Sequence, residues 1–173
     1  VTIIVNRTVQ QQYTQTLATF FNKNVELHER NLLNYLESNK AWIKSIAAQD
    51  ILLSQMEAYT KGENIDMDGI FSSLVSIRRE NPFIEQIYII NNKGEIIIST
   101  TTDDIGKPIR NKDEAIQDMS IRIPHYRSIE TLSSGVRVIA LTAPFLKRND
   151  NKLAATLVVE YNTSVIKSLI EGN

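Results

Sequence analysis

The residue types that most often carry catalysis are sparse in this sequence. Only two histidines are present, His28 and His125, and they stand in different halves of the chain. The first lies among charged residues at helical spacing, which indicates an exposed surface, and the second lies in a predicted strand, where a structural role is the simplest interpretation. There is no cysteine and no Gly-x-Ser-x-Gly nucleophile elbow. We therefore expect no catalytic site, and no enzyme activity, in this chain.

One segment has the spacing of metal ligands. Residues 64–69, Asn-Ile-Asp-Met-Asp-Gly, match the first half of a calcium-binding loop, with oxygen ligands at alternate positions before a glycine. The twelfth position, where such a loop places a bidentate glutamate, is Val75. A helix start rich in Asn and Asp accounts for the same residues through capping. Glycine-rich phosphate loops are also absent, so the sequence predicts neither a metal nor a cofactor.

The overall composition is that of an ordinary folded domain. The chain has 173 residues, of which 42% are hydrophobic and 23% are charged, and its formal net charge is -1. This length suits one domain with a real core, and the charge excludes the basic surface that holds nucleic acid. No stretch reaches the ~20 apolar residues that span a bilayer. The apolar opening, residues 1–5, is either a disordered start or the end of a transmembrane helix.

Helical periodicity dominates the first third of the sequence. From Val5 to Leu36 apolar residues recur at steps of three and four, without an intervening Pro or Gly. The pattern predicts a long amphipathic helix, a break at Ser38-Asn39, further helix after it, and a short helix that stops before Asn81-Pro82. The apolar stripe of the long helix exceeds what one small sheet can cover. We therefore expect a homodimer through the N-terminal helix.

The period then changes to two, which predicts strands separated by turns. A hairpin with the turn Asn91–Gly94 joins the first two strands. Because neighbouring hairpins pair antiparallel, the class is α+β with five strands. The expected strands are residues 83–90, 95–100, 122–130, 136–147 and 152–162, and short helices are expected over residues 113–119 and 164–170.

Alternation along these strands predicts which face holds a cavity. The first strand is apolar on both faces, so we expect the long helix to cover one face of the sheet and a loop-and-helix flap to enclose a cavity on the other. The flap joins the second and third strands. On the last strand a large apolar face suits the helix side and a smaller, partly polar face suits the cavity wall. The first face is Leu157, Val159 and Tyr161, and the second is Ala154, Thr156, Val158 and Glu160.

Five side chains are our candidates for contact with a small polar ligand. An acidic residue with a tyrosine would hold an amine-bearing group, and the guanidinium of an arginine would hold a carboxylate. The alternative is a salt-bridged or solvated position for the arginines, a place in the core for the tyrosines, and an exposed strand end for the glutamate. In the third strand Arg122, Tyr126 and Ser128 are expected to share a face. The candidates are Tyr88, Arg110, Arg122, Tyr126 and Glu160.

One ordered set of segments is more specific than its parts. A strand, the turn Asn91–Gly94 and a second strand ending in Ser99-Thr100 are followed by Asp104–Pro108, and later by residues 141–145 and 155–161. This order resembles the Cache domains, the extracytoplasmic PAS-like sensors of bacterial and archaeal receptors. The resemblance covers essentially the whole chain and fits a single Cache domain. Its parts are N-terminal helices over residues 1–62, a PAS-like core over 63–162 and a C-terminal exit helix over 163–173.

The resemblance implies a PAS-like five-stranded antiparallel sheet with the long N-terminal helix packed on one face. It also implies a small-molecule pocket under the flap, flanking transmembrane helices, and a place on the periplasmic or extracellular side of the cell membrane. Known ligands of such domains are amino acids, carboxylates and amines. The segment after Arg110 lacks the Trp and Tyr of the amino-acid-binding members, whereas Glu160 matches the acidic residue that members often place near the end of the last strand.

The sequence thus predicts an extracytoplasmic sensor domain of a transmembrane signalling receptor. The receptor would be a histidine kinase, a chemoreceptor or a cyclic-di-nucleotide enzyme, and the domain would bind a small polar molecule and relay the signal across the membrane. The alternative is a ligand-free spacer that only dimerises or binds a protein partner. A soluble hydrolase with an unrecognised site is a third interpretation.

Overall fold

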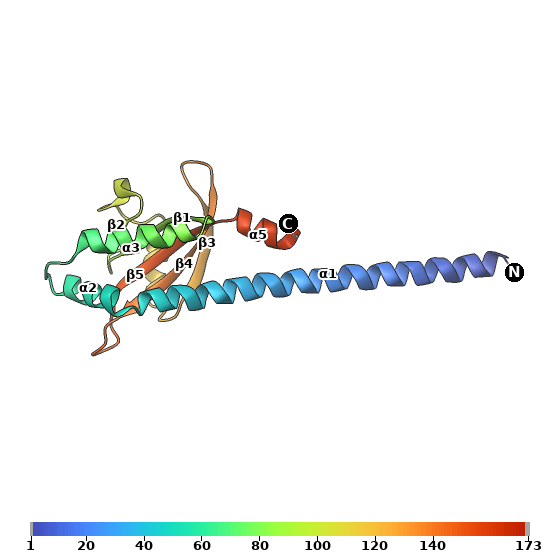
Figure 1. Cartoon of the computed structure of the whole chain (residues 1–173), viewed down its shortest axis with the longest axis horizontal. Coiled ribbons are helices and arrows are strands. Elements are labelled where there is room, and N and C mark those ends of the chain that lie inside the picture. Colours follow the sequence, from blue (N-terminus) through green and yellow to red (C-terminus); the bar gives the residue numbers. More distant parts are fainter. Residues whose placement is uncertain (1, 172–173) are drawn as a thin grey trace. The chain divides into compact units, whose positions relative to one another are not determined.

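The computed structural model describes the backbone of residues 2–171 and the side chains of residues 15–20, 22–113, 115–117 and 119–169 (Figure 1). The apolar opening at residues 1–5 and the first apolar positions of the N-terminal helix, up to Tyr13, therefore lie outside the described side chains. The chain divides into two compact units. One consists of residues 38–165, and the other combines residues 1–37 with 166–173.

The larger unit is built on one antiparallel sheet. Its strands are β1 (Ile84–Ile90), β2 (Ile96–Ser99), β3 (His125–Thr131), β4 (Arg137–Leu146) and β5 (Leu153–Asn162). The order across the sheet is β2-β1-β5-β4-β3, so the last strand in the chain lies at the centre, between the β1–β2 and β3–β4 hairpins. The predicted α+β class and the five antiparallel strands are confirmed. Only β3 differs clearly from expectation, because it begins at His125 and not at residue 122.

The hairpin between β1 and β2 shows how two residues specify a turn. Asn91 Oδ1 accepts hydrogen bonds from the backbone N–H groups of Lys93 (2.9 Å) and Glu95 (3.0 Å). Gly94 has a φ of +74°, a left-handed conformation that glycine adopts without steric cost. A Cβ at this position would also lie 3.3 Å from the side chain of Lys112. The Asn91–Gly94 turn is therefore both the expected hairpin turn and a contact with the flap.

Helices cover one face of the sheet. They are the last part of α1 (Thr2–Ala47), from residue 38 onward, together with α2 (Asp50–Thr60) and α3 (Met67–Glu80). Ile43, Met56 and Leu74, one from each helix, are fully buried in the main core between the helices and the sheet. This confirms that the N-terminal helix packs on one face of the sheet.

The N-terminal helix is more continuous than the sequence predicted. It passes through Ser38 and Asn39 without a break and ends at Ala47, so the expected break was wrong. Ser and Asn are weak helix formers, which was the reason for expecting a break. Ile43 and Ile46, in the following turns, are buried in the main core, and this tertiary packing overrides the local preference.

The calcium-like segment is a helix start. Asp66 is the N-cap of α3, and its Oδ1 accepts a hydrogen bond of 2.9 Å from the N–H of Gly69. Asp68 adds negative charge to the first turn, where the helix dipole favours it. Capping therefore accounts for this segment. Within the described part of the chain, no cluster of three or more His, Cys, Asp or Glu side chains could hold a metal ion.

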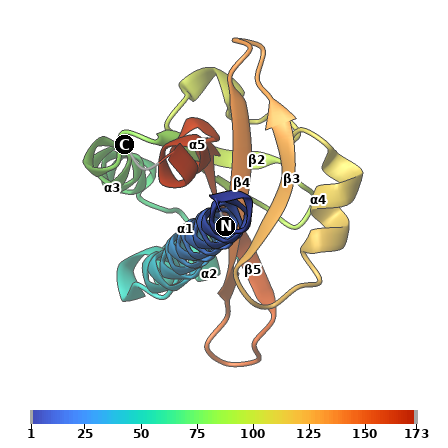
Figure 2. The same ribbon diagram turned by 90° about the vertical axis from the view of Figure 1, so that its right-hand side faces the viewer.

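The other face of the sheet is covered by residues 100–124, which connect β2 to β3 and which we call the flap. It contains a 3-10 turn, η1 (Thr102–Asp104), and the helix α4 (Lys112–Asp118). Between these two elements the chain pairs with β2 and with the turn before it: Ile96 N–H donates to the carbonyl of Lys107 (2.9 Å), and Ile109 N–H donates to the carbonyl of Gly94 (2.8 Å). In Figure 2, α4 lies on the side of the sheet away from α2 and α3.

A second, smaller core lies between the flap and the sheet. Val158 of β5 belongs to it, whereas Leu157, Val159 and Tyr161 belong to the main core, as the predicted alternation requires. Ala154 was expected on the flap side but packs in the main core. The pairing of β4 with β5 is irregular between residues 145 and 146, close to this end of β5, so a strict count of two fails there.

The smaller unit consists of α1 up to residue 37 and most of the C-terminal helix α5 (Ser164–Glu171). Nδ1 of His28 lies 3.2 Å from the backbone oxygen of Leu169, which joins the two helical segments. Large apolar side chains of this part of α1 are nevertheless exposed, among them Phe20 (60%) and Val25 (64%). No helix among the described residues combines the length and the hydropathy needed to cross a membrane.

Candidate functional site

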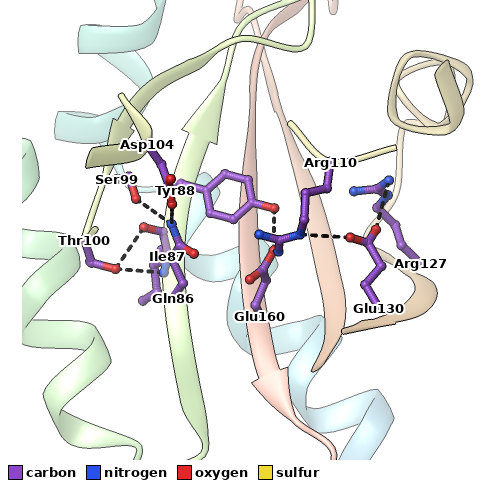
Figure 3. A network of polar contacts seen from close by, with 10 residues as sticks. All are labelled: Gln86, Ile87, Tyr88, Ser99, Thr100, Asp104, Arg110, Arg127, Glu130 and Glu160. Carbon is purple, nitrogen blue, oxygen red and sulfur yellow. Dashed lines mark hydrogen bonds and ion pairs between the residues drawn. The ribbon is translucent and has the colours of Figure 1, made fainter. Parts of the chain in front are cut away.

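The polar groups under the flap gather around one buried carboxylate, that of Glu160 on β5. Only 1% of Glu160 is exposed to solvent. The hydroxyl of Tyr88, on β1, donates a hydrogen bond of 2.8 Å to Oε1 of Glu160. The guanidinium of Arg110, in the flap, donates from Nη2 to the same oxygen. A carboxylate of the central strand is thus held by a neighbouring strand and by a cation from the flap (Figure 3).

Arg110 also binds a second carboxylate. Its Nε donates a hydrogen bond of 3.1 Å to Oε2 of Glu130, on β3. Oε1 of Glu130 lies 3.6 Å from Nη2 of Arg127, whose side chain is 1% exposed. Figure 3 shows the guanidinium of Arg110 between the two glutamates, with Arg127 beyond them. Two acidic and two basic side chains therefore form a row from the centre of the sheet to its β3 edge.

The register of the sheet brings these groups to one face. Glu160 is paired with Gln86 of β1 on one side and with Ala140 of β4 on the other, and Tyr88 is paired with Val158. Because successive side chains of a strand point to opposite faces, residues of this set share the face under the flap. Ala140 carries only a methyl group, which leaves space above β4 for the arginine side chain that reaches Glu130.

The flap places Arg110 through main-chain contacts on both sides of it. Arg110 follows Ile109, which is buried and hydrogen-bonded to the β1–β2 turn. Asn111 then has a φ of 49°, a left-handed conformation that asparagine tolerates, and α4 begins. Nearer β2, Gln86 Nε2 donates to Asp104 Oδ2 in η1 at 2.9 Å. The flap is thus anchored to β1 by an amide and to β5 by an arginine.

The protonation states of this cluster follow from burial and charge. Burial raises the pKa of the Glu160 carboxyl above its ordinary value, and Arg110 and Tyr88 oppose this only in part. Burial and the charge of Glu160 raise the pKa of Tyr88 well above its ordinary value, so its hydroxyl keeps the proton that it donates. Burial lowers the pKa of Arg110, but the attraction of Glu160, Tyr88 and Glu130 outweighs it and the pKa is raised. The arginine therefore stays cationic.

A cavity of about 170 Å³ opens beside the cluster. Gln86, Tyr88, Asp104, Lys107 and Arg110 supply its polar walls. Since one water molecule takes about 30 Å³ of liquid, the volume corresponds to roughly six waters. A polar molecule of few heavy atoms fits such a space. The walls offer hydrogen-bond donors, acceptors and charges of both signs, which suits reversible binding.

The structure brings together three of the five predicted ligand residues, Tyr88, Arg110 and Glu160. It does not bring Tyr126 to them. Tyr126 packs against the main core on the helix side of the sheet, where Nζ of Lys40 lies 5.9 Å from its ring centroid.

Arg122 is also separate from the cluster. It precedes β3 and lines a different recess, between β4 and the end of α1. Arg122 and Tyr126 both lie toward the helices and not, as expected, on the face under the flap. Alternation fails to place them for two reasons. Residues 122–124 lie outside β3, and the pairing of β3 with β4 is irregular between Tyr126 and Ile129. A β-bulge of this kind shifts the alternation by one residue.

Sequence reasoning missed three members of the cluster: Gln86, Arg127 and Glu130. Arg127 stands next to Tyr126, which was expected on the ligand face, so a count of two places Arg127 on the opposite face. Glu130 lies beyond the irregular pairing, so counting by two does not place it. Gln86 shares the face of Tyr88 by simple alternation, and this signal was available from the sequence.

Comparison with known proteins identifies the fold. A scan against protein-family models gives no match, and no curated protein matches the sequence. Among solved structures, the sensor domain of the V. cholerae histidine kinase DctB matches with a TM-score of 0.70 at 14% identity, over 91% of this chain and 60% of that one. The chain therefore has the same fold as the sensor domains of DctB and DcuS, and the predicted PAS-like fold is confirmed.

Two further structures show the range of receptors that use this fold. The E. coli DcuS sensor domain matches with a TM-score of 0.59 at 13% identity, over 80% of this chain and 96% of that domain. The ligand-binding domain of the Campylobacter jejuni chemoreceptor Tlp3, in complex with 4-methylisoleucine, matches with a TM-score of 0.61 at 14% identity, over 85% of this chain and 59% of that one. The chain spans about 60% of the length of the DctB and Tlp3 domains.

Proposed function

We propose that this chain is the extracytoplasmic sensor domain of a transmembrane signalling receptor and that it binds a small polar molecule under the flap. The observation that carries the proposal is the contact between Arg110 of the flap and the buried carboxylate of Glu160 on the central strand. A purely structural sheet gains little from a buried ion pair, because desolvation offsets most of the attraction. A cavity beside such a pair allows its charged groups to take part in binding a ligand.

The walls of the cavity favour an amine, an amino acid or a carboxylate. Asp104 and Tyr88 in the walls offer a carboxylate and a hydroxyl to an amine-bearing ligand, and Glu160 lies behind the walls, hydrogen-bonded to Tyr88. Arg110 and Lys107 offer donors to a carboxylate. The size of the cavity limits the ligand to a small molecule. The ligand of the chemoreceptor Tlp3 in its solved complex, 4-methylisoleucine, is an amino acid.

The position of Glu160 suggests how occupancy would be relayed. Glu160 belongs to β5, which ends at Asn162, and α5 begins at Ser164. A ligand that changes the contacts of Glu160 therefore acts on the strand that leads directly into the C-terminal helix. In a receptor, that helix would continue toward a transmembrane segment, with this domain on the periplasmic or extracellular side of the cell membrane.

The exposed apolar side chains of α1 support self-association. Leu17, Phe20 and Leu27 are exposed, and their steps of three and seven residues place them on one side of the helix, whereas Val25 and Leu33 are exposed on other sides. An apolar stripe of this length is typical of a helix that packs against another helix. We propose that a second copy of this chain covers it. The dimer would be weak in isolation, because transmembrane segments normally raise the effective concentration of the partners.

A thermal-shift screen with amines, amino acids and organic acids tests the proposal. A ligand present at a hundred times its dissociation constant stabilises the fold by about 2.7 kcal/mol. Glu160→Gln should lose this stabilisation, and Glu80→Gln, an exposed glutamate at the end of α3, should keep it. If no compound of the three classes shifts the melting temperature, the alternative of a ligand-free spacer is favoured.

A further inference from the structure

We propose that Arg110 occupies the position of the ligand's cationic group, and that a small monocation, an alkylamine or alkylguanidine, binds Glu160 by displacing the Arg110 guanidinium. This inference rests on the proposed function, because it names the ligand class and the regulation of the same site. It assigns Arg110 the role of a competitor tethered to the flap. An arginine that holds a ligand carboxylate would have the opposite effect on binding.

The first argument is the surplus of acceptors around Arg110. Glu160 and Glu130 both bind this one guanidinium, each through a single oxygen. The second oxygen of Glu160, Oε2, is buried and has no hydrogen-bond partner among the described residues, and Oε1 of Glu130 has no hydrogen bond there and only the ion pair of 3.6 Å with Nη2 of Arg127. An ionised carboxylate accepts several hydrogen bonds and donates none. The hydrogen-bond acceptors that lack donors at the centre of the site therefore favour a ligand rich in N–H groups. A ligand that carries a carboxylate would add further acceptors.

The second argument is the difference in burial between the two partners. The side chain of Glu160 is 2% exposed, whereas that of Arg110 is 40% exposed. Glu160 is held in the central strand and cannot leave without unfolding the sheet. Arg110 reaches it from a connecting segment and faces solvent with part of its side chain. The anion is thus the fixed member of the pair and the cation is the exchangeable one.

The third argument concerns the cost of exchange. A buried carboxylate that loses its cation is strongly destabilised. A carboxylate that exchanges one cation for another keeps its compensation, and the released arginine regains water. Exchanging one cation for another therefore costs the folded chain less free energy than losing the cation without a replacement. The cavity is lined by Arg110 and Tyr88, the two side chains that bind Glu160, so a cation in it lies beside the pair and reaches Glu160 when the guanidinium moves away.

Displacement would also release the flap. The amide of Gln86 fixes η1, but Arg110 makes the ion pairs that tie the segment before α4 to β5 and β3. When a free cation takes the place of the guanidinium, these two ties are lost together. Ligand binding and loosening of the flap then become one event on the strand that leads into α5.

Binding to Arg110→Ala measures this competition directly. If the arginine leaves Glu160 open about one tenth of the time, its removal lowers the apparent dissociation constant about tenfold. Titration calorimetry with ethylguanidine and with butylamine should therefore show at least about tenfold tighter binding to Arg110→Ala than to the wild type. Arg79→Ala removes an exposed arginine of α3 on the other face of the sheet and should bind like the wild type. The double variant Arg110→Ala/Glu160→Gln should bind neither cation.

Hydrogen exchange in the wild type provides a test that does not depend on a variant's folding. Saturating ethylguanidine should speed exchange of the Ile109 N–H, which bonds to the carbonyl of Gly94 just before Arg110, and leave unchanged the Lys147 N–H, which bonds to Lys152 in the β4–β5 hairpin outside the flap. Slower exchange at Ile109 would overturn the inference, because it would show closure of the flap on the ligand.

The outcomes separate this inference from the proposed function. Weaker binding of cations to Arg110→Ala than to the wild type would overturn it and make Arg110 a ligand contact, with the sensor proposal intact. Binding of a carboxylate but of no amine or guanidine would have the same meaning. If the wild type binds none of the three classes, both proposals fall.

Discussion

Replacing Tyr88 with phenylalanine removes one hydroxyl from the interior of the sheet and leaves the ring in place. Tyr88 is 2% exposed, and its hydroxyl donates a hydrogen bond of 2.8 Å to Oε1 of Glu160. A hydrogen bond to a charged group contributes about 1.5–3 kcal/mol, and a neutral one about 1 kcal/mol. We therefore expect Tyr88→Phe to lower the free energy of unfolding by about 2 kcal/mol when Glu160 is ionised and by about 1 kcal/mol when it is protonated.

Urea unfolding followed by circular dichroism, at about pH 8 and about pH 4, separates these two values. Tyr59→Phe is the matched control, because Tyr59 is a half-buried tyrosine on the other face of the sheet. In a Glu160→Gln background, Tyr88→Phe should lower the free energy of unfolding by only about 1 kcal/mol at both pH values, as expected for a neutral hydrogen bond. If Tyr88→Phe costs no more than Tyr59→Phe, the hydrogen bond contributes nothing and the reasoning about the cluster is wrong.

Three further predictions concern pH, the turn and the helix. The folded-state pKa of Glu160 lies above its ordinary value of 4.5, so the folded chain keeps this proton longer than the unfolded chain and loses stability as the pH rises through the window above 4.5. Glu160→Gln should make the melting temperature less dependent on pH in that window. If its dependence on pH is the same as in the wild type, burial of the charge is contradicted. Gly94→Ala and Gly106→Ala should each cost about 1 kcal/mol because both glycines have positive φ. Only the alanine at position 94 also meets a side chain, 3.3 Å away, so Gly94→Ala should cost more in urea unfolding. Equal losses would show that this neighbour moves freely. Phe20→Asp should raise the dimer dissociation constant at least about tenfold in analytical ultracentrifugation, whereas the exposed control Asn22→Asp should not. Equal effects of the two variants would remove α1 from the interface.

The fold could be predicted because its signals are local and repeated. Alternation of apolar residues and the turn Asn91–Gly94 predicted the first hairpin. The same alternation on β5 predicted that Leu157 and Val159 pack on the helix side and Val158 on the flap side. The continuity of α1 could not be predicted, since Ser38-Asn39 looks like a break and only the packing of the residues after it decides otherwise.

The candidate site was predicted only as far as alternation reaches. Tyr88 and Glu160 lie on regular parts of the two central strands, and their face follows from a count of two. Arg127 and Glu130 lie on either side of irregular pairing in β3, and a bulge leaves no mark in the sequence that a period could reveal. Arg110 lies in the flap, and no period in the sequence shows which strands its guanidinium will reach.

The central position of β5 has a consequence for how the molecule folds. Tyr88 and Glu160 are neighbours in space but 72 residues apart in the chain. The two hairpins can form early from local contacts, but neither can join the other until the last strand lies between them. Folding through such distant contacts is slow, because the entropy of closing long loops is lost before the contacts form. A chain emerging from a ribosome or a translocon would therefore expose both hairpin edges until β5 had been released, and a truncation that removes β5 would leave two unpaired hairpins with a strong tendency to aggregate.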